Sequence, residues 1–112
     1  EIIKNTQLGI NFFNKYKDNE VFISTISIFE LFLRETNLGP VEKFLFNANI
    51  IDFTEICSRK AASVLKDLKK EGKMIEFRDL FIASTAIVSG CALATLNKKH
   101  FENIKDLKLL DF

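Results

Sequence analysis

Three oxygen-bearing side chains of this sequence stand just after short β-prone or apolar segments. Glu30 lies in the run Ser-Thr-Ile-Ser-Ile-Phe-Glu-Leu (24–31), Asp79 in Phe-Arg-Asp-Leu-Phe-Ile-Ala (77–83) and Asn97 in Ala-Thr-Leu-Asn-Lys-Lys-His-Phe (94–101). Carboxylates that converge repel one another and are costly to bury without a cation, whereas Mg²⁺ or Mn²⁺ prefers hard oxygen ligands. Such an ion lowers the pKa of a bound water and stabilises charge that develops on a phosphate. Convergence of these side chains would therefore predict a metal site for phosphodiester hydrolysis.

Each of the three residues also has a structural explanation. Ser27-x-x-Glu30 satisfies the pattern of a capping box, in which the carboxylate bonds the backbone amide of the cap residue. Asp79 and Asn97 fit ordinary N-caps. Their joint occurrence favours a site, because three successive strand-to-helix junctions of a parallel sheet meet at one edge of that sheet.

The elements that would position these residues alternate along the chain. Hydrophobic periodicity, Gly and Pro positions and cap residues predict helices at residues 7–16, 27–35, 41–46, 54–70, 80–88 and 99–103, and strands at 21–24, 50–53, 91–95 and 107–110. Asn37-Leu38-Gly39-Pro40 predicts a stop between two helices, and Gly72 and Gly90 predict helix ends. Alternating strands and helices predict an α/β fold, with a parallel sheet covered by helices on both faces.

Length, charge and cysteine content narrow the class of protein. A chain of 112 residues with 47% hydrophobic content fits one domain, residues 1–112. Sixteen basic and fifteen acidic residues leave a net charge of +1, so any site for a polyanion must be a local patch. Cys57 and Cys91 form no metal or disulfide motif, which favours buried structural thiols in a reducing cytoplasm. The longest apolar run, around 82–88, is too short to span a membrane, and we expect a soluble intracellular protein.

The same segments resemble, in order, the signatures of the PIN-domain VapC toxins. The resemblance rests on Ile-Ser-Thr-Ile-Ser-Ile-Phe-Glu-Leu (23–31), Asp-Leu-Phe-Ile-Ala (79–83), Thr-Leu-Asn-Lys-Lys-His-Phe (95–101) and Leu-Lys-Leu (107–109). No single motif is very specific, but the ordered set runs over essentially the whole chain. The resemblance implies a three-layer α/β/α fold with a short parallel sheet. It also implies a metal-dependent endoribonuclease of a type II toxin–antitoxin system, usually a homodimer held inactive by a VapB-type antitoxin.

The resemblance also assigns roles to individual residues. It implies that Glu30 and Asp79 are ligands of Mg²⁺ or Mn²⁺, and that Asn97 completes the catalytic pocket with a neutral oxygen. Thr95 matches the threonine usually found at its position. An RNA phosphate is expected near a further group of side chains, which with Thr95 are the predicted RNA-binding residues: Arg78, Lys98, Lys99 and His100. His100 could otherwise be a neutral surface histidine.

Two departures from the family pattern affect the expected activity. The family begins with a hydrophobic strand that ends in Asp-Thr or Asp-Ser, whereas this sequence starts at Glu1-Ile2-Ile3-Lys4, which resembles the family's segment just after that motif. His100 stands where an acid is common. We therefore expect this chain to cleave RNA poorly. We interpret the chain as a fragment of a longer protein rather than a degenerate family member.

Two other functions remain open on the sequence alone. A non-catalytic PIN-like module could serve dimerisation and capture of an antitoxin helix by Phe29, Phe32, Phe44 or Phe46, and the missing aspartate favours that alternative. A DNA-directed or flap-type nuclease could use a similar metal site, although the short chain argues against the larger flap enzymes.

Overall fold

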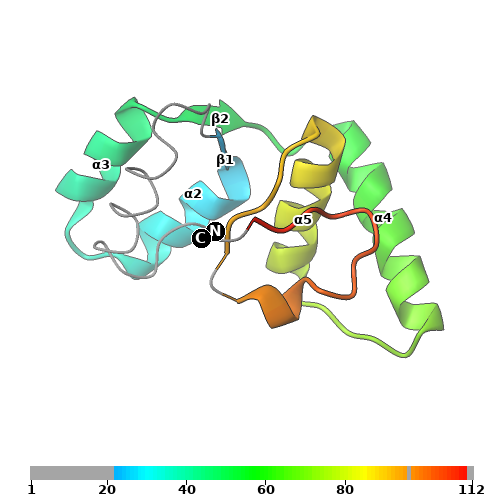
Figure 1. Ribbon diagram of the computed structural model, residues 1–112. Helices are drawn as coiled ribbons and strands as arrows, with labels where there is room; N and C mark the ends of the chain where they lie inside the picture. Colours follow the sequence, from blue (N-terminus) through cyan, green and yellow to red (C-terminus); the bar gives the residue numbers. More distant parts are fainter. Residues whose placement is uncertain (1–21, 96, 111–112) are drawn as a thin grey trace.

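The computed structural model describes residues 22–95 and 97–110. The elements follow the order β1 (Phe22–Ser24), α2 (Thr25–Arg34), α3 (Leu38–Phe46), β2 (Asn49–Ile51), α4 (Glu55–Lys70), α5 (Phe77–Ser89) and the 3₁₀-helix η1 (Lys98–His100). Figure 1 shows α2 and α3 on one side of the two strands and α4 and α5 on the other. The helix predicted at residues 7–16 lies outside the described residues.

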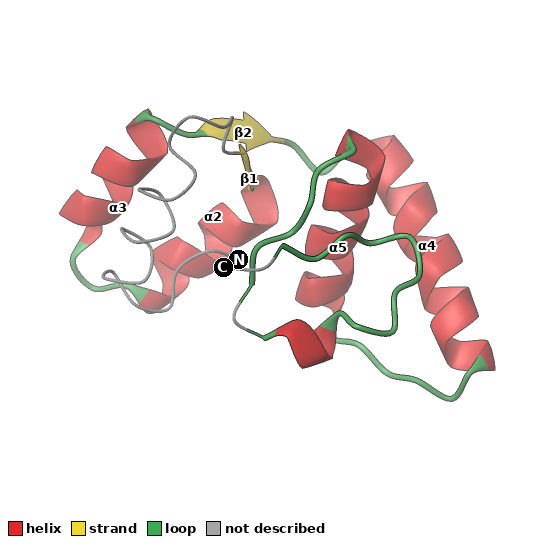
Figure 2. Cartoon of the chain, in the orientation of Figure 1, coloured by secondary structure: helices red, strands yellow, loops and turns green. Residues whose placement is uncertain are grey.

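The strands β1 and β2 pair in parallel, which confirms the predicted α/β class. Phe22 is opposite Asn49, Ile23 opposite Ile50 and Ser24 opposite Ile51. Helices α2 and α3 form the connection between the two strands, as Figure 2 shows. The second strand ends two residues earlier than predicted.

The strands predicted at residues 91–95 and 107–110 are reduced to one parallel bridge between Leu93 and Leu109. Its two hydrogen bonds run from the Leu93 amide to the Lys108 carbonyl and from the Leu110 amide to the Leu93 carbonyl, both 2.8 Å. Leu93 and Ala94 are nevertheless buried. The apolar pattern thus predicted burial correctly, but a longer strand also needs an aligned partner, which hydrophobicity does not report.

Helix α2 begins earlier than predicted because Ser24 caps it. The Ser24 hydroxyl accepts a hydrogen bond from the Ser27 amide at 3.0 Å, and Ser24 itself has an extended backbone. Ser27 is therefore an internal residue of the helix, and the capping box Ser27-x-x-Glu30 is wrong. A serine at the end of β1 lets the chain pass directly from strand to helix.

Two other helix starts also differ from prediction. Helix α3 begins at Leu38, capped by the Asn37 side chain, which accepts from the Gly39 amide at 3.3 Å. Pro40 is tolerated inside this first turn because its missing N–H would have no partner there. Helix α5 begins at Phe77, so Asp79 lies within the first turn and is not the N-cap.

The predicted ends of α4 and α5 are confirmed. Thr54 caps α4 by accepting from the Cys57 amide at 3.4 Å. Gly72 and Gly90 follow the two helices with φ of 68° and 69°, a left-handed conformation that glycine adopts without steric cost.

None of the helices among the described residues is both long and apolar enough to cross a membrane.

The core has two parts. The larger cluster joins α4 and α5 to the C-terminal segment, and the smaller one lies among β1, α2 and α3. The buried members of the larger cluster are Ala61, Val64, Leu68, Leu80, Ile82, Ala83, Ala86, Leu93, Phe101 and Ile104, and those of the smaller are Ile23, Leu31 and Val41. Helices α2 and α5 contact each other between the two clusters.

Cys57 belongs to the interior, as the sequence predicted for a structural thiol. Burial raises the pKa of the Cys57 thiol, but hydrogen bonds that involve Thr54 and Thr85 together lower it by more, so the pKa lies below its ordinary value. The Thr54 hydroxyl is 3.4 Å from the sulfur. Cys91 is partly exposed.

Candidate metal and nuclease site

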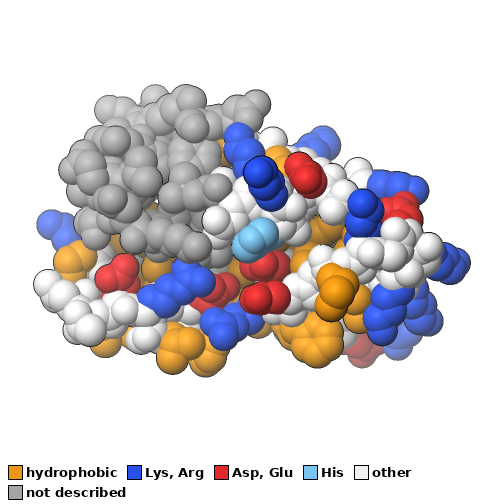
Figure 3. Space-filling view, turned by 90° about the horizontal axis from the view of Figure 1, so that it is seen from below, with side chains coloured by type: hydrophobic (Ala, Val, Ile, Leu, Met, Phe, Trp, Pro, Cys, Tyr) orange, Lys and Arg blue, Asp and Glu red, His pale blue; other side chains and the backbone are white. Residues whose placement is uncertain are grey.

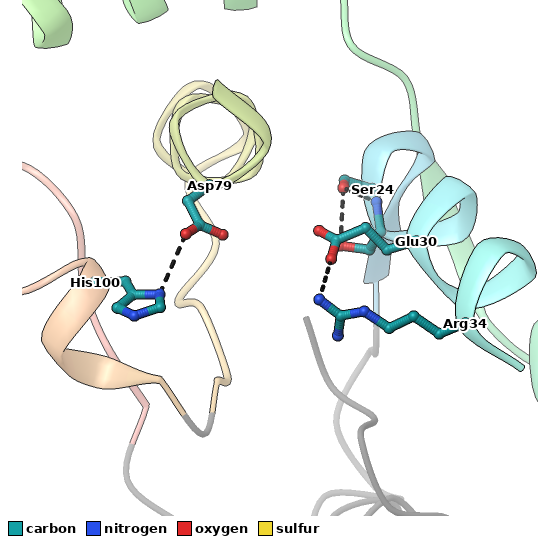
Figure 4. Close-up of polar contacts among 6 residues, drawn as sticks. Ser24, Glu30, Arg34, Asp79 and His100 are labelled. Atoms are coloured by element: carbon teal, nitrogen blue, oxygen red, sulfur yellow. Dashed lines mark hydrogen bonds and ion pairs between the residues drawn. The ribbon is translucent and has the colours of Figure 1, made fainter. Parts of the chain in front are cut away.

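The carboxylates of Glu30 and Asp79 lie on the facing sides of α2 and α5. Figure 4 shows Glu30 pointing from α2 toward the α5 side and Asp79 at the nearby end of α5. Both residues are buried, with exposed fractions of 4% and 8%. Two acidic side chains from distant parts of the sequence therefore lie on the sides of α2 and α5 that face each other (Figure 4).

Glu30 is buried because it lies on the inner face of α2. Ser27 and Leu31, three residues before it and one after, are also buried, whereas Phe29, Phe32 and Leu33 are exposed. Positions 27, 30 and 31 share one face at the helical period. The face that packs the helix onto the core thus carries the carboxylate inward.

Asp79 is positioned by the start of the most buried helix. It lies in the first turn of α5, immediately before Leu80, in a helix whose buried residues extend to Ala86. The free amides of a first turn favour a negative charge there. The helix terminus therefore supplies part of the stabilisation that a buried carboxylate needs.

Each carboxylate is within ion-pair distance of a basic side chain (Figure 4). Arg34 Nη2 is 2.8 Å from Glu30 Oε2, and His100 Nδ1 is 3.3 Å from Asp79 Oδ2. Sequence reasoning missed Arg34, although Glu and Arg four residues apart on a helix signal such a pair. For His100 the sequence predicted either a contact with an RNA phosphate or a neutral surface histidine. His100 is indeed 59% exposed, and its contact with Asp79 is a tertiary feature that no local spacing indicates.

The third predicted junction, around Asn97, lies just before η1, whose last residue, His100, contacts Asp79. The buried Thr95 hydroxyl accepts a hydrogen bond from the Asn97 amide at 3.1 Å. Asn97 occupies the N-cap position of η1, as one alternative predicted, but its side chain makes no capping hydrogen bond there. His100 at the end of η1 brings the loop to Asp79. Thr95 therefore shapes the backbone that carries Asn97 to His100.

Basic side chains surround the acidic pair. The Arg78 guanidinium lies 5.8 Å from the centre of the exposed Phe29 ring, and this contact links the rims of α5 and α2. Lys98 is partly exposed and Lys99 is exposed. Figure 3 shows the histidine beside acidic side chains, with lysines and arginines around them. Acidic and basic side chains are therefore mixed on this face of the molecule (Figure 3).

Glu30 and Asp79 could supply part of the ligand set of a divalent metal ion. Within residues 22–95 and 97–110, no three Asp, Glu, His or Cys side chains are grouped so that they could hold an ion. The two buried carboxylates can still serve as hard oxygen ligands for Mg²⁺ or Mn²⁺, because Mg²⁺ usually keeps several waters and takes only one or two protein carboxylates. In the absence of an ion, Arg34 offsets the charge of Glu30, and His100 Nδ1 lies 3.3 Å from Asp79 Oδ2.

Comparison with known proteins agrees with this architecture. A family model described as PIN domain matches residues 7–107. The chain is 34% identical to Ribonuclease VapC1 of Methanocaldococcus jannaschii over 99% of this chain and 88% of the relative, and 34% identical to Ribonuclease VapC2 of Rickettsia felis over 83% and 75%. The solved structure of VapBC2 from Rickettsia felis, bound to a DNA fragment from their promoter, superposes with a TM-score of 0.81 at 29% identity, covering 95% of this chain and 85% of that one.

Proposed function

The chain belongs to the PIN-domain family of VapC ribonucleases, and we propose that it is a metal-dependent endoribonuclease, the toxin of a type II toxin–antitoxin pair. The observation that carries the metal-dependent part is the pair of buried carboxylates, Glu30 and Asp79, on facing sides of two packed helices. Two buried carboxylates in one region are costly, and a divalent ion bound by both would offset their charge, whereas the side chain of Arg34 lies beside Glu30 alone. The family model spans most of residues 1–112, which supports a single domain.

In this proposal Glu30 and Asp79 bind Mg²⁺ or Mn²⁺, and Asn97 adds a neutral oxygen to the pocket. The bound ion would activate a water and stabilise negative charge on the phosphate. The chain contributes the orientation of both carboxylates: the Ser24 cap sets the start of α2, and packing of α5 sets Asp79. Fixed ligands matter because an ångström of misplacement can reduce a reaction rate by about 100-fold.

The proposed RNA-binding surface is formed by the side chains around this pair. Arg78, Lys98 and Lys99 would contact phosphates, and His100 is placed to do so from its exposed side. Phosphate contacts of this kind position a nucleic acid but do not select its sequence. Thr95 is buried, so we assign its contribution to the shape of the loop.

A VapB-type antitoxin is the proposed protein partner, together with a second copy of the chain. The observation that supports a partner is the exposed apolar face of α2 and α3, with Phe29, Phe32, Leu33 and Phe46. An amphipathic helix binds such a surface through its own apolar side chains. Phe44, predicted for the same role, packs against the smaller core cluster instead.

The first experiment is calorimetry of Mn²⁺ binding to the full-length protein, alongside Mg²⁺-dependent cleavage of single-stranded RNA and of the matching DNA. Glu30→Gln should weaken Mn²⁺ binding and RNA cleavage together. Glu55→Gln is the control, because Glu55 forms the same i,i+4 pair with an arginine on the surface of α4. Equal effects of both substitutions would refute the metal site, and absence of Mn²⁺ binding would favour the non-catalytic module. Preferential cleavage of the DNA would refute the RNA assignment.

A further inference from the structure

Arg34 is a basic residue beside Glu30 to which neither motif nor resemblance assigns a role. It lies in the last turn of α2, one turn beyond Glu30, and its guanidinium is 2.8 Å from the Glu30 carboxylate. The Glu30 side chain is 5% exposed, whereas that of Arg34 is 41% exposed. One end of this ion pair is therefore buried in the site, and the other is open to an approaching ligand.

The chemistry of the Glu30–Arg34 pair allows each side chain to exchange its partner for another ion. A guanidinium keeps its charge at every physiological pH, so Arg34 offsets the Glu30 charge as long as it stays in place. A divalent ion on Glu30 would take over that task, since it brings two positive charges to the same oxygens. The long, partly exposed Arg34 side chain would then lose its attraction to Glu30 and could bind another anion. Guanidinium groups match phosphate as well as carboxylate, in both cases through paired N–H donors.

We propose that Arg34 is a substrate-binding residue of this site, held by Glu30 in the metal-free protein and transferred to a phosphate of the RNA when the metal binds. The inference rests on the proposed metal site, and it adds a residue and an order of events to it. Because the pair is on one helix, the transfer involves rotation of the Arg34 side chain about its own bonds while its backbone stays in α2. The same helix thus positions a metal ligand and a phosphate ligand one turn apart.

The test compares Arg34→Gln with Arg59→Gln in the full-length protein. Arg59 forms the same i,i+4 ion pair with Glu55 on the surface of α4, where both side chains are 78% exposed. Arg34→Gln should raise the KM for single-stranded RNA by about tenfold while kcat changes little. It should also reduce the slope of log KM against log salt concentration by about 0.7, the loss of one phosphate contact. Arg34→Lys should retain the slope, because it retains the charge.

Metal binding provides the second measurement. Removal of the competing guanidinium should strengthen Mn²⁺ binding without RNA by about two- to fivefold, in keeping with a partly exposed pair. Partial unfolding would lower kcat and leave KM unchanged, so it cannot imitate the expected pattern. An unchanged KM and salt slope, or weaker Mn²⁺ binding, would overturn the inference. Full cleavage by Glu30→Gln would instead overturn the proposed function.

Discussion

Asp79→Asn should abolish most of the cleavage while it leaves the fold intact. Asp79 is 8% exposed and lies at the start of α5, so asparagine fills nearly the same space without the charge. Loss of an outer-shell partner of a metal ligand typically costs about 10–100-fold in affinity or activity. We expect loss of a direct ligand to cost at least about 100-fold in kcat/KM, equivalent to about 2.7 kcal/mol of barrier.

The effect on stability can be bounded from the contacts of Asp79. The ion pair with His100 is worth about 0–1 kcal/mol, because His100 is 59% exposed and solvent screens the pair. A carboxylate in the first turn of a helix adds about 0.3–1 kcal/mol. Asparagine loses both but no longer places a second negative charge opposite Glu30. The free energy of unfolding should therefore fall by at most about 2 kcal/mol, or about 8 °C in Tm.

The assay combines RNA cleavage under Mg²⁺ with thermal unfolding followed by circular dichroism. A domain of ordinary stability, about 5–15 kcal/mol, stays folded after such a loss, so the two effects separate. Asp106→Asn is the matched control. The Asp106 side chain is 68% exposed, and its Oδ2 forms an ion pair with Lys60 Nζ at 3.1 Å. Cleavage by Asp79→Asn within about threefold of the control would refute its role as a ligand. A fall in Tm far beyond about 8 °C would show that Asp79 acts through the fold.

Three further predictions concern the surroundings of the site. Ser24→Ala removes the acceptor for the Ser27 amide and should cost about 1 kcal/mol in unfolding free energy, measured by urea denaturation; an unchanged midpoint would mean that Ser24 does not stabilise the start of α2. Thr95→Val leaves the Asn97 amide without its hydroxyl acceptor and should lower kcat/KM by about tenfold with a near-normal Tm, unless the loop geometry does not depend on this bond. The Cys57 thiol, buried in the core, should react with a thiol reagent only as fast as the protein unfolds; rapid labelling at room temperature would contradict its burial.

Much of the helical framework could be predicted from the sequence. The apolar periodicity of α4 and the glycines at 72 and 90 are local signals, and each is confirmed. Helix starts were less certain because more than one residue could act as the cap. Ser24 and Ser27 are both suitable at the start of α2, and only the position where β1 ends decides between them.

Strand pairing was predicted less well, for a different physical reason. The segment at 91–95 has the apolar composition of a buried strand, and its residues 93–95 are indeed buried. A strand, however, is defined by hydrogen bonds to a neighbour distant in sequence. In the described part of the chain this neighbour aligns only at Leu93 and Leu109.

The sequence by itself determined which residues could form the site, whereas the tertiary structure decided how those residues are paired. Glu30 and Asp79 were predicted as candidates because each follows a β-prone or apolar segment, which is a local property of the sequence. The packing of α2, α5 and η1 decides the partners of these residues. It brings Asp79 to His100 and Arg78 to Phe29. It also buries Glu30 and leaves Arg34 partly exposed. Charges interact through space over a few ångströms, so their partners are fixed by the fold and not by their separation along the chain.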